Sequence, residues 1–182
     1  RIVAGIATVA PPSGAEVIET TSAEDMRAAV LREIEDATIF IAAAAVADYR
    51  AKQSSPKKIK KSEAEMVLEL ERTPDILNEV ALNKTTSQLM VGFAAETDDV
   101  KRNAQTKLSQ KNLDMIVAND VSHEGSGFES DNNAVTILVR DNPLSIDVPL
   151  SSKSEVANRI LDEVVKLRHR TTSAMTAKHS KL

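Results

Sequence analysis

Cysteine is absent from this 182-residue sequence, and aromatic residues make up only 2% of it, with no tryptophan. The lack of cysteine excludes a disulfide scaffold, a zinc ribbon and a cysteine nucleophile, and it is typical of a reducing environment. No apolar run approaches the roughly 20 residues that a membrane-spanning helix requires. We therefore expect a soluble, cytoplasmic protein that does not enter a membrane.

An excess of positive charge is also lacking, because the net charge is -4 at pH 7. A general nucleic-acid binder would carry a basic face and often aromatic side chains that stack on bases, so this class is excluded. The patterns GxGxxG and GxxxxGK[ST] are missing as well. The sequence therefore predicts neither a P-loop nor a standard dinucleotide site, which disfavours a Rossmann-type oxidoreductase.

Short β-rich runs alternate with amphipathic helices along the chain, which is typical of an α/β fold. We expect a three-layer, Rossmann-like and mostly parallel sheet with helices on both faces. Strands are predicted at 2–4, 16–19, 38–42, 66–70, 89–93 and 114–118, followed by a hairpin of 134–140 with 145–150. Capping signals predict helices that begin after Ser22, Thr73, Asp98 and Ser152.

Small residues at 43–47 follow the buried strand 38–42 and precede Asp48. Ligands of open α/β sheets bind at the carboxyl ends of strands. Small side chains such as that of Ala44 let backbone groups approach a planar ligand, and an acid at position 48 can meet a ribose hydroxyl or a phosphate-bound cation. The alternative is that these small residues only pack a loop tightly beneath a helix.

Four lysines crowd into residues 57–61, interrupted by Ile59. Ammonium groups neutralise phosphate charge, so this cluster favours a small, strongly anionic ligand such as a triphosphate. Lys107 and Lys111 lie four residues apart on a predicted helix and would extend the cation set. The alternatives are a solvated loop in the first case and a charged outer helix face in the second.

Asp75 and Phe93 could each have either a structural role or a role in ligand binding. Asp75 falls in the first turn of a predicted helix, where it complements the helix dipole beside backbone N–H groups that also suit an anion. Phe93 follows Gly92 at a strand end and would pack either in the core or against a base.

Six segments occur in a specific order: AAVADYR at 44–50, PKKIKK at 56–61, TPDIL at 73–77, VGFAAET at 91–97, NLDMIVANDVS at 112–122 and GFESDNN at 127–133. This series resembles the CTP-dependent phosphopantothenoylcysteine synthetases of coenzyme A biosynthesis. These form the synthetase half of the bacterial bifunctional phosphopantothenoylcysteine decarboxylase/synthetase. The resemblance runs from about residue 3 to residue 167.

The resemblance implies a phosphopantothenate–cysteine ligase. CTP would activate the carboxylate of 4'-phosphopantothenate as an acyl-cytidylate with release of pyrophosphate, and the amine of cysteine would then form the amide with release of CMP. Mg²⁺ would accompany the triphosphate through unknown ligands. FMN would belong only to a separate decarboxylase domain outside this chain.

The same resemblance assigns roles to individual residues. Ala44 would read the cytosine through backbone groups, Asp48 would contact the nucleotide, and Lys58 would be the mobile catalytic cation. The other residues expected to bind the nucleotide are Pro74, Asp75, Ile76, Leu77, Phe93, Lys107 and Lys111.

The expected organisation is a synthetase domain over 1–168 and a disordered tail over 169–182. The family's glycine-rich opening strand and its asparagine-containing phosphate segment do not occur before Ile2, so we expect a portion of the catalytic domain. A homodimer is implied, with the 66–70 strand and the 134–150 hairpin as its expected contacts. The alternative function is a non-catalytic nucleotide-binding or regulatory module.

Overall fold

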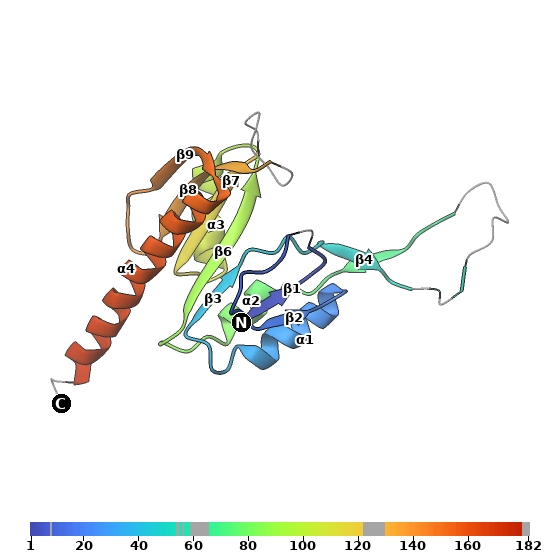
Figure 1. The fold of residues 1–182 in the computed structure, drawn as a ribbon, viewed down its shortest axis with the longest axis horizontal. Helices are drawn as coiled ribbons and strands as arrows, with labels where there is room; N and C mark the ends of the chain where they lie inside the picture. The colour runs from blue at the N-terminus through green and yellow to red at the C-terminus, as the bar shows by residue number, and fades with distance from the viewer. Residues whose placement is uncertain (8, 54, 56, 59–65, 122–129, 180–182) are drawn as a thin grey trace. The chain divides into compact units, whose positions relative to one another are not determined.

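A computed structural model describes residues 1–7, 9–53, 55, 57–58, 66–121 and 130–179, with side chains described as far as Thr171. The chain divides into two compact units. The first unit comprises Arg1–Glu35 and Ala44–Ile76, and the second comprises Asp36–Ala43 and Leu77–Leu182. Figure 1 labels most of the helices and strands of both.

The second unit is built on a five-stranded sheet of order β3-β6-β7-β8-β9 (Figure 1). Its strands are β3 (Ile39–Ala42), β6 (Leu89–Glu96), β7 (Met115–Asp120), β8 (Asn132–Val139) and β9 (Ile146–Ser152). The first three are parallel, whereas β8 and β9 continue the sheet in antiparallel pairing. The α/β class and the hairpin predicted from the sequence are confirmed, and the complete sheet is mixed.

Helices cover both faces of this sheet. The helix α4 (Lys153–His179) packs on β8 and β9, and α3 (Val100–Gln110) packs on β6, β7 and β8. The core on the α4 side gathers Val91, Met115, Val117, Val135, Ile137, Val139, Val148, Val156, Ile160 and Val164. Burial on both faces explains why residues 115–118 form a continuous apolar run instead of an alternating one.

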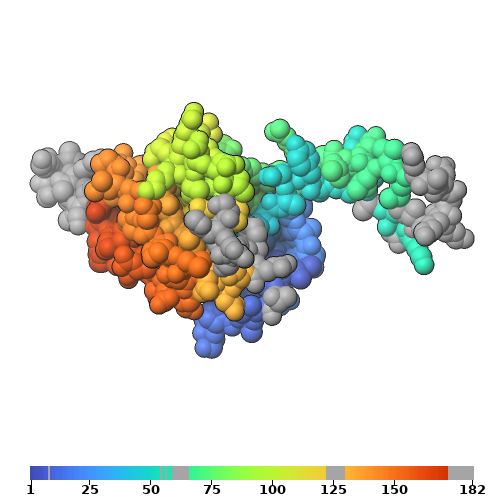
Figure 2. All heavy atoms as spheres, turned by 90° about the horizontal axis from the view of Figure 1, so that it is seen from above, coloured from blue at the N-terminus to red at the C-terminus, as the bar shows by residue number. Residues whose placement is uncertain are grey.

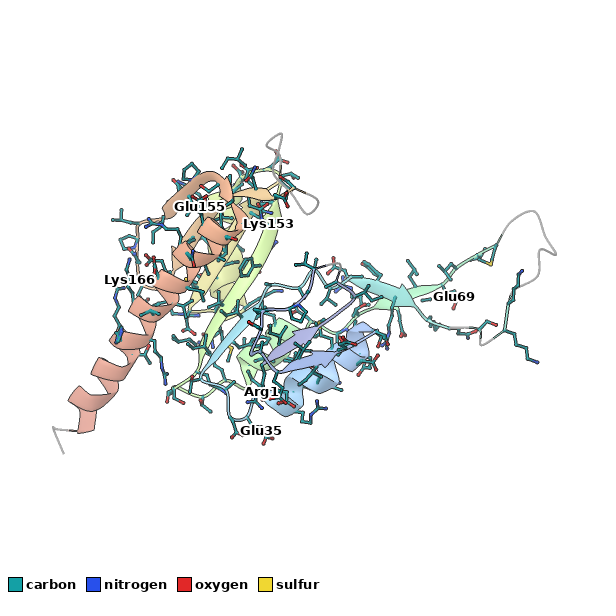
Figure 3. All side chains as sticks on the ribbon, viewed as in Figure 1. Arg1, Glu35, Glu69, Lys153, Glu155 and Lys166 are labelled. Carbon is teal, nitrogen blue, oxygen red and sulfur yellow. The ribbon has the colours of Figure 1, made fainter. Side chains whose placement is uncertain are left out.

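The start of α4 is a capping box. The backbone N–H of Ser152 donates to Glu155 Oε2 at 3.0 Å, and the N–H of Glu155 donates to Ser152 Oγ at 3.2 Å. Figure 3 labels Glu155 in the first turn of the helix. The predicted cap is therefore confirmed. The helix continues to His179. The disorder predicted for 169–182 stays a prediction.

The first unit contains two small sheets and one helix. The strands β1 (Ile2–Ala4) and β2 (Val17–Glu19) pair in parallel, and α1 (Ala23–Glu33) packs on β1. Its N-cap, Ser22, accepts the N–H of Asp25 at 3.1 Å, as the sequence predicted. The strands β4 (Tyr49–Ala51) and β5 (Leu70–Arg72) form an antiparallel ribbon. In Figure 2 the cyan and green spheres of this ribbon extend away from the blue spheres of α1.

The ribbon corrects two predictions. The strand expected at 66–70 begins only at Leu70, and the strand β4, which begins at Tyr49, was not among the strands expected from the sequence. Tyr49 pairs with Arg72, and Ala51 pairs with Leu70. The reason is that such short strands depend on their cross-strand partner more than on their own β-propensity.

The helix expected after Thr73 forms as α2 (Ile76–Leu82), but the predicted cap is wrong. The Thr73 hydroxyl is buried and has no hydrogen-bond partner among the described residues. The N–H of Thr73 donates instead to the carbonyl of Asp48 at 2.9 Å. Thr73 therefore continues the backbone pairing of the ribbon, which leaves its side chain out of the capping position.

Candidate functional site

The carboxyl ends of β3, β6 and β7 meet at one edge of the second unit, because these strands are parallel. Leu77, one of the candidate residues, packs on β6 where Gly92 has no side chain. A Cβ added to Gly92 would lie 2.7 Å from Leu113 Cδ1 and 3.0 Å from Leu77 Cδ2. Glycine at this position therefore lets both leucines approach the strand, and Leu77 has a packing role independent of any ligand.

Phe93 lies on the face of β6 that carries α4. Its ring is half-buried and packs against the core cluster that includes Val91 and Val117. The interpretation of Phe93 as a core aromatic is thus supported by its surroundings, and a contact with a base stays a prediction.

Lys107 projects from α3 toward the last residue of β6. Its Nζ donates to Glu96 Oε1 at 2.6 Å, and Asn103 Nδ2 donates to Glu96 Oε2 at 3.2 Å. The Glu96 side chain is only 9% exposed, whereas that of Lys107 is 44% exposed. One candidate cation is therefore held by a buried carboxylate that the sequence analysis did not single out. An available signal was the acid in VGFAAET at the end of a buried strand.

Lys111 is the C-cap of α3 and is half-buried. Its backbone N–H donates to the carbonyl of Lys107 at 3.0 Å. A rise of about 1.5 Å per residue separates the two lysines by about 6 Å along the helix axis. At this end of the helix a positive charge also complements the helix dipole, so the structure gives Lys111 a local role as well.

In the first unit the structure brings Asp48 beside the segment that holds Pro74 and Asp75. The link is the hydrogen bond from the Thr73 N–H to the Asp48 carbonyl. Ala44, Asp48 and Asp75 are exposed, Pro74 is half-buried, and Ile76 is buried. The structure therefore joins the backbone of Asp48 to the segment that leads into α2, and a ligand site at these residues stays a prediction.

Lys58 is described and exposed, as is Lys57. The side chain of Lys58 makes no hydrogen bond or ion pair to any other residue that the structure describes. The other lysines of the predicted cluster, Lys60 and Lys61, lie outside the described residues. An exposed ammonium without an internal partner fits the expectation of a cation that moves to its ligand.

Arg50, which ends the AAVADYR segment, has a different environment. Its Nε donates to Glu71 at 2.8 Å, and its Nη1 donates to Glu24 at 3.2 Å. The hydrogen bond to Glu71 raises the pKa of Arg50, and Glu24 adds to this shift. Both ion pairs are exposed, so each contributes little to the stability of the fold.

A family model described as the C-terminal domain of the DNA/pantothenate metabolism flavoproteins matches residues 1–167. The chain belongs to this family. Within the part of the chain that the structure describes, no helix is long and apolar enough to cross a membrane. No group of three or more His, Cys, Asp or Glu residues that could hold a metal ion occurs there either.

Two curated relatives match almost the whole of this chain. The chain is 44% identical to the coenzyme A biosynthesis bifunctional protein CoaBC of Bacillus subtilis (strain 168), over 93% of this chain and 42% of the relative. It is 41% identical to a cysteine/cysteine sulfinic acid decarboxylase of an unknown prokaryotic organism, over 92% of this chain and 47% of that protein. The chain therefore spans less than half the length of these curated relatives.

A solved structure also matches this chain. It is the crystal structure of the C-terminal domain of a CoaBC protein, which is 37% identical to this chain with a TM-score of 0.75. The match covers 92% of this chain and 74% of that domain. This solved domain is thus similar to the chain in sequence and in fold.

Proposed function

We propose that this chain is a CTP-dependent phosphopantothenate–cysteine ligase. The observation that carries the proposal is the match to the C-terminal domain of CoaBC across 92% of the chain, in sequence and in fold. Two features support it locally: Lys58 is exposed, and the exposed residue Asp48 is joined through its backbone carbonyl to Thr73, just before α2.

In the proposed reaction the carboxylate of 4'-phosphopantothenate attacks the α-phosphorus of CTP. An acyl–oxygen–phosphorus bond forms while the bond to the β-phosphate breaks, and pyrophosphate leaves. The amine of cysteine then attacks the acyl carbon, forms the amide, loses a proton and expels CMP. These steps need charge neutralisation and positioning more than a protein nucleophile.

The residue roles follow from this chemistry. Lys58 neutralises the negative charge that grows on the leaving pyrophosphate, and its exposed side chain suits a movement toward the nucleotide. Ala44 presents backbone groups to the cytosine, and Asp48 contacts the ribose or the phosphate-bound cation. The proposed nucleotide contacts are completed by Pro74, Asp75, Ile76, Leu77, Phe93, Lys107 and Lys111.

Mg²⁺ fits these residues as an ion carried by the triphosphate. Magnesium in such sites binds one or two carboxylates together with phosphate oxygens and waters, so a dedicated protein cage is not needed. Asp48, exposed in the first unit, would be the carboxylate. When bound, the ion supplies neutralisation of phosphate charge. We assign FMN to a separate decarboxylase domain outside this chain.

The homodimer and the cytoplasmic location are parts of the same proposal. Leu70 of β5 and Leu150 of β9 are 56% and 51% exposed, which leaves apolar surface for a second copy on both expected dimer contacts. Small-angle X-ray scattering at micromolar concentration would give the mass of a dimer. The mass of a monomer would contradict the proposed assembly.

The decisive experiment measures pyrophosphate release by the full chain with CTP and 4'-phosphopantothenate, and CMP release after cysteine is added. The ligase predicts pyrophosphate in the first stage and CMP in the second. CTP binding without pyrophosphate release would favour the alternative, a non-catalytic nucleotide-binding module. Absence of both binding and release would contradict the two proposals together.

A further inference from the structure

Glu96 is a buried acid to which the proposed function gives no role. It is the last residue of β6, and its side chain is 9% exposed. Its two carboxylate oxygens are used by different donors, Lys107 at 2.6 Å and Asn103 at 3.2 Å. A carboxylate with such low exposure stays charged only when an opposite charge and hydrogen bonds compensate its burial. Lys107 and Asn103 provide this compensation for Glu96.

The backbone around Glu96 is fixed from two directions. Its carbonyl accepts the N–H of Val121 at 3.1 Å, and the residue lies opposite Asp120 in the parallel pairing of β6 with β7. The donors are fixed as well, since Asn103 and Lys107 stand one turn apart on α3 and Asn103 Nδ2 also donates to the carbonyl of Asp98 at 2.9 Å. Glu96 is thus a rigid anchor for a flexible side chain.

The anchor leaves Lys107 able to bind a second group. A lysine ammonium has three N–H donors, and among the described residues Lys107 donates to Glu96 alone. Its side chain is 44% exposed, so the remaining donors face solvent. A free lysine loses rotamer entropy when it binds an anion, whereas a lysine already held by Glu96 has lost most of it before the ligand arrives.

A second ion pair, between Lys101 of α3 and Asp147 of β9, shows how burial distinguishes Glu96. Lys101 contacts Asp147 at 2.7 Å, almost the same distance, but the two side chains are 57% and 59% exposed. An exposed pair of this kind is screened by water and holds neither partner firmly. The two pairs therefore differ in burial and not in length, which makes Asp147 a matched control.

We propose that Glu96 is a positioning residue that holds the Lys107 ammonium in the orientation in which it meets the triphosphate of CTP. This role rests on the proposed function, because it needs CTP as the ligand of Lys107. A model based on charge alone predicts the opposite effect of Glu96 on CTP binding. If charge alone mattered, the neighbouring carboxylate would weaken the attraction of Lys107 for phosphate, and removing that negative charge would tighten binding.

The direction in which Glu96→Gln changes CTP affinity distinguishes the positioning role from the effect of charge alone. We expect Glu96→Gln, which keeps the shape but removes the charge, to weaken CTP binding about tenfold by calorimetry, as the loss of a charge-assisted hydrogen bond would. Lys107→Met should weaken binding at least as much. The double variant should bind no more weakly than Lys107→Met, because Glu96 acts through Lys107. Asp147→Asn should stay within about twofold of the unaltered chain.

Thermal unfolding of every variant shows whether the affinities come from folded protein. If Glu96→Gln does not fold, the ¹⁵N NMR signal of the Lys107 ammonium in the unaltered chain decides: slow proton exchange before CTP is added supports the role, and rapid exchange overturns it. CTP affinity that Glu96→Gln leaves unchanged or raises, or additive losses in the double variant, would also overturn it. An unaltered chain that binds no CTP would overturn the proposed function and this role with it.

Discussion

The five-stranded sheet of the second unit buries its apolar residues, whereas the β4–β5 ribbon of the first unit leaves its apolar residues exposed. Met90 and Val91 in the sheet are 0% exposed, whereas Tyr49 and Leu70 in the ribbon are 54% and 56% exposed. Burial of apolar surface is the main source of folding free energy. The sheet therefore stabilises its unit, while residues on and beside the ribbon are available for ligands at little cost to stability.

The largest expected effect lies in the sheet. Met90→Ala removes a fully buried side chain and should lower the free energy of unfolding by about 3 kcal/mol. Denaturation in urea measures the loss. Tyr49→Ala in the ribbon, at a side chain that is 54% exposed, is the control and should change stability by no more than about 0.5 kcal/mol. Equal losses for the two variants would show that the contrast between sheet and ribbon is wrong.

Beside the ribbon the effect should appear in turnover instead of stability. Lys58→Gln removes a cation proposed to act on the leaving pyrophosphate, and pyrophosphate release should fall about a hundredfold. The melting temperature should hardly move, because an exposed lysine contributes little to folding.

The matched control for Lys58 is Lys52→Gln, which removes another exposed lysine whose Nζ pairs with Glu69 at 3.3 Å. It should keep near-normal turnover. Turnover of Lys58→Gln within a few fold of the unaltered chain would remove Lys58 from the mechanism.

A smaller effect is expected at Asp48. Asp48→Asn keeps the backbone bond to Thr73 but removes the charge, so CTP affinity should fall about tenfold in calorimetry performed with Mg²⁺. Asp141→Asn in the turn between β8 and β9 is a control, since asparagine tolerates the φ of 60° found there. Unchanged affinity for Asp48→Asn would place the nucleotide elsewhere.

The smallest expected effect is the contribution of the helix-capping carboxylates to the pH dependence of stability. Hydrogen bonds from Ser152 lower the pKa of Glu155, and those from Ser22 and Thr21 lower the pKa of Asp25. A carboxyl whose pKa is lower in the folded state contributes stability above its ordinary pKa, near 4, and loses it as the pH falls through the folded value.

Stability should therefore decline between about pH 5 and pH 2, and Glu155→Gln should make this decline shallower. Ser152→Ala should have the same effect on the slope, because it removes the hydroxyl hydrogen bond that contributes most to the lowered pKa of Glu155. Urea denaturation across this pH range measures the slopes. A slope that neither variant alters would contradict the assigned role of the cap.

Local signals predicted much of this fold because their cause lies within a few residues. The Ser152 cap depends on Glu155 three positions later, and β6 and β7 follow from continuous apolar runs. The run at 38–42 was predicted to be a fully buried central strand, which is wrong, because β3 lies at the edge of the sheet and Ile41 is 38% exposed. The ribbon was misplaced because Tyr49 needs Arg72 as a partner, and propensity does not reveal that pairing. The Thr73 cap failed for a related reason, because Thr73 continues the backbone pairing of the ribbon with Asp48 and its hydroxyl makes no hydrogen bond among the described residues.

The candidate site shows the same limit. The order of the motifs singled out Asp48 and Lys58, yet Glu96 was missed although it lies in VGFAAET. Its importance comes from burial and from Lys107 on a helix that must first pack on β6. Motif order can therefore indicate a ligand class, whereas the partners that orient each group emerge only from the packed structure.

The central claim is that this chain holds CTP through small residues, an acid and lysine side chains. Its most direct test is a crystal structure of the full chain with CTP and Mg²⁺. The account predicts the cytosine against the backbone of Ala44, the ribose or the magnesium ion at Asp48, and the triphosphate within hydrogen-bond reach of Lys58 and Lys107. Nucleotide density at another place, with no density beside Asp48, would contradict it.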